Sequence, residues 1–80
     1  MNPHAEQVVQ SFLEDSIPLE HFLLEWTTWG PEDQYQAFAK VILLDEKKGI
    51  QMHGQVKDRI LEIVQKNHTG HPVMLPQKRK

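Results

Sequence analysis

Two histidines near the C-terminus have the spacing of a partial metal site. His68 and His71 are three positions apart, and two imidazoles at this spacing can begin a zinc site. Zinc needs three or four ligands, and the sequence holds neither a cysteine nor an HExxH motif to complete the set. Exposed loop histidines explain the pattern better, so we predict no metal and leave the role of His68 and His71 open.

Carboxylates, which general acid–base catalysis uses, occur in three adjacent pairs near the ends of predicted helices. The pairs are Glu14-Asp15, Glu32-Asp33 and Asp45-Glu46. Capping and surface solvation account for acids at such positions, and nothing in their spacing shows convergence in a cleft. His21 and Glu25 are four residues apart, which suits an ion pair along one helix. The four glycines are isolated, so no phosphate-binding loop is present. We predict no enzymatic activity and no cofactor.

The segment Trp26-Thr27-Thr28-Trp29-Gly30 is the most unusual local feature. Its two tryptophans are three residues apart, on one face at the end of an acidic helix. One interpretation is that both anchor the core of a small domain. The other is that Trp29, beside the break at Gly30, is exposed and contacts a partner, because tryptophan is enriched at binding hot spots.

Charge is divided unevenly between the two halves of the chain. Residues 1–46 carry nine acidic residues and one basic residue, whereas residues 47–80 carry eight basic residues and two acidic ones. The halves are therefore −8 and +6, and the whole chain is −2. Either the halves dock and partly cancel each other's fields, or the dipolar surface steers a charged partner onto one face.

The basic residues of the second half could contact phosphates of a nucleic acid. They are Lys57, Arg59, Lys66, Lys78, Arg79 and Lys80. No aromatic residue interleaves the last three, and residues 46–55 are too long for the tight turn of a helix-turn-helix motif. A net charge of −2 also argues against a dedicated nucleic-acid binder.

Length and composition restrict the fold that must position these residues. Eighty residues support a single domain, and the absence of cysteine excludes disulfides and thiolate metal sites. The longest apolar run, Val41–Leu44, is far too short to cross a membrane. The polar, acidic N-terminus does not read as a signal peptide. We expect a soluble cytoplasmic protein with no membrane partner.

Apolar residues recur at helical spacing in four segments. The first begins at Asn2-Pro3, a capping residue followed by a proline suited to the first helical position, and runs to about Glu14. The second follows Ser16, a candidate cap, and stops at Gly30.

The third segment opens at Pro31 and ends at Lys47-Lys48-Gly49. It contains the run Val41–Leu44, which is apolar nearly all round, and this segment is therefore predicted to be the central, most buried helix. The fourth runs from Val56 to about Lys66, while Ile50 to Gly54 reads as a turn or a frayed helix start.

Together these features predict an all-α fold, a small single domain of three to four short helices. Residues 1–70 form the helical domain, and residues 71–80 form an extended, flexible basic tail on which Val73, Met74 and Leu75 are candidates for docking onto the body.

We predict a small non-enzymatic regulator or inhibitor that docks on a larger protein, for example part of a nucleic-acid machine such as a transcription complex. Its acidic, aromatic-bearing face would comprise Glu20, Glu25, Trp29, Glu32, Asp33 and Tyr35. The alternative is a nucleic-acid-binding module that uses the basic fourth helix and the tail.

Overall fold

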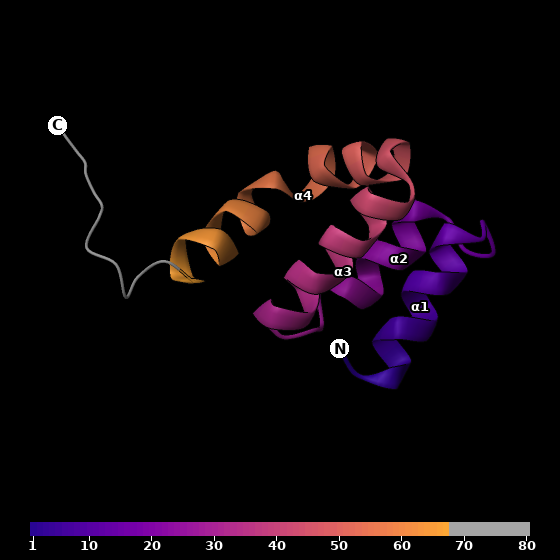
Figure 1. Ribbon diagram of the computed structural model, residues 1–80, viewed down its shortest axis with the longest axis horizontal. Helices are drawn as coiled ribbons and strands as arrows, with labels where there is room; N and C mark the ends of the chain where they lie inside the picture. Colours follow the sequence, from indigo (N-terminus) through magenta and orange to yellow (C-terminus); the bar gives the residue numbers. More distant parts are fainter. Residues whose placement is uncertain (68–80) are drawn as a thin grey trace, which may run out of the picture.

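The computed structural model describes residues 1–67 and shows four α-helices, which confirms the all-α prediction (Figure 1). The helices are α1 (Pro3–Leu13), α2 (Leu19–Trp26), α3 (Pro31–Leu44) and α4 (Glu46–Asn67). No strand occurs among the described residues. The predicted tail, with Lys78, Arg79 and Lys80, lies outside the described residues, as do His68 and His71.

The start of α1 follows the predicted capping pattern. The Asn2 side-chain oxygen accepts a hydrogen bond from the Ala5 amide at 2.8 Å, and Pro3 occupies the first helical turn. This cap satisfies one of the amides that have no partner within the helix. By contrast, α2 has Pro18 rather than Ser16 at its N-terminal boundary, without a side-chain cap.

The C-terminus of α2 comes earlier than Gly30, because two threonines compete for its last carbonyls. The Thr27 hydroxyl donates to the Leu24 carbonyl at 3.0 Å, and the Thr28 hydroxyl donates to the Glu25 carbonyl at 2.6 Å. Side-chain hydroxyls of this kind offer the backbone an alternative to continued helix. Trp29 therefore lies in the turn after α2, and the two tryptophans do not share a helical face.

The boundary between α3 and α4 also differs from the prediction. Asp45 (φ −151°, ψ 88°) interrupts the helix, and its side chain accepts a hydrogen bond from the Lys48 amide at 3.2 Å. Lys47-Lys48-Gly49 therefore forms the first turn of α4 rather than the end of α3. Residues 50–54 are helical, and α4 bends at Val56 (φ −127°, ψ 23°) instead of beginning there. In Figure 1, α4 passes over α3 and its C-terminal half extends away from α1.

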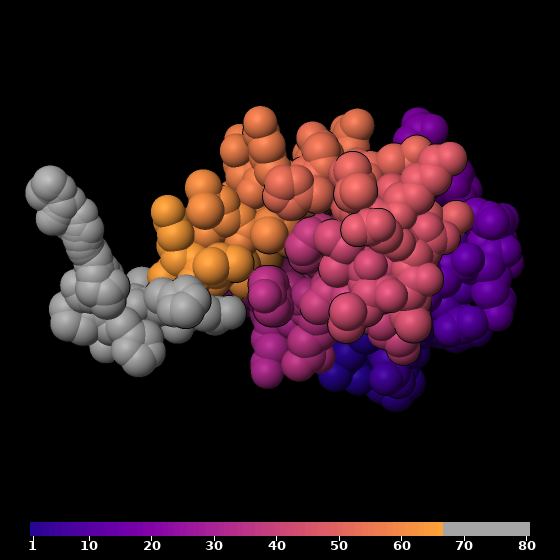
Figure 2. Space-filling view, turned by 45° about the horizontal axis from the view of Figure 1, so that its top comes forward, coloured from indigo at the N-terminus to yellow at the C-terminus, as the bar shows by residue number. Residues whose placement is uncertain are grey.

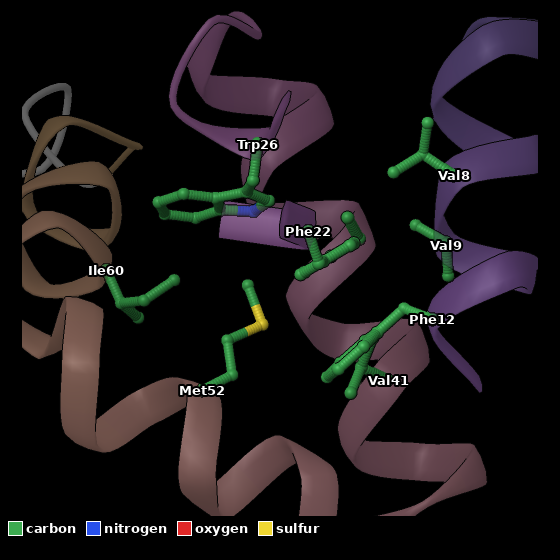
Figure 3. Close-up of a cluster of buried hydrophobic side chains, with 9 residues drawn as sticks. Val8, Val9, Phe12, Phe22, Trp26, Val41, Met52 and Ile60 are labelled. Carbon is green, nitrogen blue, oxygen red and sulfur yellow. The ribbon is translucent and has the colours of Figure 1, made fainter. Parts of the chain in front are cut away.

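The core lies where the four helices meet (Figure 3). The Phe12 and Phe22 rings stack with centroids 4.5 Å apart, and the Phe22 and Trp29 rings form a T-shaped pair with centroids 6.1 Å apart. Met52 brings a flexible thioether from α4 into the space beside Trp26 (Figure 3). The fully buried larger side chains are Trp26, Phe22, Met52, Ile63, Val9 and Val41.

The helix α3, which carries the apolar run Val41–Leu44, is not the most buried helix, because three of its 14 residues are buried against four of the 11 in α1. Val41 is buried, but Leu43 and Leu44 are 83% and 65% exposed. The reason is that α3 packs mainly against α4 and α1, which leaves part of its circumference uncovered. A helix that is apolar nearly all round yet covered on two sides presents leucines to its surroundings.

An ion pair fastens the start of α4 to the loop between α1 and α2. Lys48 Nζ lies 2.6 Å from Asp15 Oδ1 and 3.5 Å from Asp45 Oδ2. Asp15 has φ 63°, a left-handed conformation that aspartate tolerates better than most residues. The hydrogen bond from Lys48 to Asp15 raises the pKa of the lysine, and burial opposes that rise.

Candidate functional site

A hollow of about 390 Å³ lies between α3 and the two halves of α4, and we call it the α3–α4 groove. Its α3 wall consists of three aromatic or aliphatic residues at positions i, i+3 and i+7. Its α4 wall consists of residues before and after the bend at Val56. The lining residues are Tyr35, Phe38, Ile42, Ile50, His53, Ile60 and Val64. Figure 2 shows α4 lying alongside α3 on the surface of the molecule.

Two backbone features of α4 build the groove. At Gly49 the helix passes so close to α3 that an added Cβ would lie 2.6 Å from the Ile42 Cα atom. At Val56 the backbone leaves helical geometry and redirects the second half of the helix. The kink thus lets Ile50 and Ile60, ten residues apart, line the same hollow.

The groove is chemically suited to binding apolar side chains. Ile50 is 60% exposed and Tyr35 is 39% exposed. The polar groups in the lining are the Tyr35 hydroxyl and the His53 imidazole, whose ring lies 5.8 Å from the Phe38 ring. Apolar residues that gather around one hollow indicate an interaction site, whereas single exposed apolar residues scattered over a surface do not.

Only one residue of the predicted docking face, Tyr35, lines the groove. Two others make contacts with the N-terminal residues. The Glu25 carboxylate lies 3.1 Å from His4 Nε2, and Asp33 accepts a hydrogen bond from the Asn2 side chain at 3.3 Å. These two carboxylates therefore help to hold the N-terminal segment in place.

The remaining members of that face differ in exposure. Glu20 and Glu32 are exposed, and the structure gives neither an ion pair among residues 1–67. Trp29 is half-buried against the core through its contact with Phe22. Glu32 is nearest in sequence to the groove, three positions before Tyr35 and hence on the neighbouring turn of α3.

Of the α4 residues in the predicted nucleic-acid-binding set, Arg59 makes side-chain contacts within the domain. Arg59 Nε donates to the Gln34 side-chain oxygen at 2.9 Å, and its NH1 group lies 2.6 Å from a Glu62 oxygen. Lys57 and Lys66 are exposed. A second hollow, of about 510 Å³, is lined by Lys57 and Arg59 but also by Asp58.

The Arg59–Glu62 pair predicts a pH dependence of stability. The hydrogen bond and charge of Arg59 hold the pKa of Glu62 below its ordinary value of 4.5. A lowered pKa in the folded state adds stability above the ordinary value, and this contribution is lost as the pH falls through the folded-state pKa. We expect Glu62→Gln to reduce the fall in urea midpoint between pH 7 and pH 3. The matched variant is Glu20→Gln, which removes an exposed carboxylate that forms no ion pair among residues 1–67 and so controls for the loss of one charge. Equal slopes for Glu62→Gln and the parent chain would contradict the role given to this pair.

Sequence reasoning identified the α3 wall of the groove only as a helical face. Tyr35, Phe38 and Ile42 have the spacing of buried residues, and nothing in the sequence shows that their neighbour would bend away at Val56. The sequence shows that apolar residues surround the end of α3 on nearly all sides. That pattern is also typical of a buried helix, so it did not identify Leu43 and Leu44 as exposed.

Comparison of the chain with protein-family models, characterised proteins and solved structures gives no match. Among residues 1–67, no helix is long and apolar enough to span a membrane, and no cluster of three metal-ligating side chains occurs.

Proposed function

We propose that this chain is a small non-enzymatic protein-binding domain, a regulator or inhibitor that docks on a larger partner. The observation that carries the proposal is the α3–α4 groove, an apolar hollow left open between two packed helices. An apolar segment of a partner, laid along the groove, would cover Ile50 and Tyr35 and remove their surface from water.

Two exposed acids, each within one helical turn of a groove residue, suggest the chemistry of that partner. Glu32 and Glu46 are exposed. Glu32 precedes Tyr35 by three residues and Glu46 precedes Ile50 by four, spacings that place each acid beside a groove residue. A partner segment with an apolar centre and flanking basic residues would complement this arrangement, with charge acting mainly on the association rate. The docking surface is thus centred on the groove, and it retains Glu32 and Tyr35 from the predicted face.

A substitution at the groove tests the proposal. Ile50→Glu places a charge in the apolar surface at a residue that is already 60% exposed, so the fold should tolerate it. We expect this variant to bind the partner about tenfold or more weakly, because a buried carboxylate without a counter-ion is costly. The measurement is a nuclease-treated pull-down from lysate of the native host, followed by titration with the recovered partner.

The matched control is Leu24→Glu, at a residue that is 73% exposed on α2, a helix that contributes nothing to the groove. This variant should bind like the parent chain. Equal retention of the partner by Ile50→Glu would contradict the groove assignment. Loss of all binding after nuclease treatment would favour the nucleic-acid alternative, which stays a prediction. Its members within the described residues are Lys57, Arg59 and Lys66.

A further inference from the structure

The groove opens beside the point at which the described chain ends. Val64 lines the groove, and α4 ends at Asn67, less than one helical turn later. Thirteen residues, 68–80, follow in the sequence. The groove and the segment after Asn67 are therefore neighbours by connectivity alone.

The following segment is long enough to reach every part of the groove. The apolar run is six to eight residues after Asn67, and extended chain of that length spans about 20–27 Å. The distance along α4 from Asn67 back to Ile50 is about 25 Å for a straight helix and shorter for a bent one. A tether of this length also gives a high effective concentration, on the order of millimolar.

The chemistry of this segment matches the groove. Val73-Met74-Leu75 is the one run of three apolar residues after Asn67, and Met suits an irregular hollow because its side chain is flexible. Pro72 and Pro76 flank the run and disfavour helix, so its side chains would enter the groove from an extended backbone.

The charges match as well. Three basic residues, Lys78, Arg79 and Lys80, come shortly after the apolar run. The exposed acids beside the groove are Glu32 and Glu46, and residues 1–46 carry a net charge of −8. An apolar run with adjoining bases is the same chemistry that the proposed partner needs.

We propose that Val73-Met74-Leu75 binds in the α3–α4 groove of the same molecule and competes with the partner for it. Occupation of the groove does not depend on the proposed function, whereas competition rests on it. If the segment fills the groove in nine molecules of ten, the apparent affinity for the partner falls about tenfold.

Paramagnetic labelling of the full chain tests the occupation of the groove without a partner. The chain has no cysteine, so Gln77→Cys gives a single attachment site for a spin label. We expect the label to broaden the methyl resonances of Ile42 and Ile50 and to leave those of Leu24 sharp. Adding Met74→Asp and Leu75→Asp to the labelled chain should restore the groove resonances, because the apolar contact is removed.

Three results would overturn the proposal. The groove methyls could remain sharp in the labelled chain, or they could stay equally broadened after the aspartate substitutions. In the third case, the broadening would appear in an unlabelled, isotope-enriched chain mixed with labelled chain, which would mean that a second copy fills the groove.

The partner titration separates this proposal from the proposed function. If both hold, Met74→Asp with Leu75→Asp should tighten partner binding, while Ile50→Glu weakens it. Broadening of the groove methyls without any effect of Ile50→Glu on partner binding would leave the intramolecular contact standing and contradict the proposed function. Sharp groove methyls together with weaker partner binding by Ile50→Glu would support partner docking and contradict the intramolecular contact.

Discussion

Replacing Gly49 with alanine should lower the free energy of unfolding by about 3 kcal/mol, which is the upper part of the range for overpacking. The new Cβ atom would lie 2.6 Å from Ile42 Cα and 2.7 Å from Ile42 Cβ. Because the nearest obstacle is the backbone of α3, a change of side-chain rotamer cannot relieve the clash, and the two helices must separate. Urea denaturation at pH 7 measures the effect, and the thermal midpoint should fall by roughly 12–24 °C.

Gly54 in the same helix provides the control. A Cβ atom added there meets nothing within 4 Å, and the residue has a negative φ angle. Gly54→Ala should therefore stabilise the domain by about 0.5–1 kcal/mol, the usual gain when alanine replaces a helical glycine. Similar effects at the two positions would mean that the close approach of α4 to α3 at Ile42 is absent in solution, and with it one of the features that build the groove.

The second large effect is expected at Gln34, the buried polar residue of the core, which is 2% exposed. Its side-chain amide donates to the Trp26 carbonyl at 3.0 Å, and its side-chain oxygen accepts from Arg59 at 2.9 Å. The Trp26 indole in turn donates to the Gln34 carbonyl at 2.9 Å. The Gln34 side chain therefore donates a hydrogen bond to the last residue of α2 and connects α3 to Arg59, in the part of α4 beyond the kink.

Gln34→Leu should lower the free energy of unfolding by about 1–3 kcal/mol, because two hydrogen bonds in the interior are lost. The Trp26 carbonyl keeps only its bond from the Trp29 amide, at 3.1 Å, and Arg59 loses an acceptor. Gln36→Leu makes the same chemical change on the exposed side of α3 and should alter stability by less than about 0.5 kcal/mol. Urea midpoints of the two variants give the comparison. If Gln34→Leu were as stable as the parent chain, the hydrogen bonds of Gln34 would not be holding the second half of α4.

The parts of the fold that local chemistry determines were predictable from the sequence. The cap at Asn2, the helical start at Pro31 and the helical spacing of Phe22 and Trp26 all depend on residues within one or two turns of each other. Local patterns failed where a distant segment changes the outcome. Gly49 resembles a helix terminator, but its lack of a side chain serves the contact with Ile42, and only the fold shows that contact.

The candidate site was less predictable than the helices. The six predicted docking residues were chosen by charge and aromatic type. Two of them, Glu25 and Asp33, contact N-terminal residues, and one, Tyr35, lines the groove. The groove depends on the bend at Val56, which leaves Tyr35 and Ile50 exposed around one hollow whose floor includes the buried Ile60. A helical pattern reports which residues share a face, but not how much of that face a bent neighbour covers.

Photo-crosslinking from position 50 tests most directly whether the α3–α4 groove is a docking surface for another protein. A photoreactive amino acid replaces Ile50 in one full-length chain and Leu24 in another, and both are irradiated in the native host. The proposed function predicts one discrete cross-linked protein from position 50, identified by mass spectrometry, and its absence from position 24. The same products from both positions, or cross-links from position 50 only within the chain or to a second copy of it, would contradict that function.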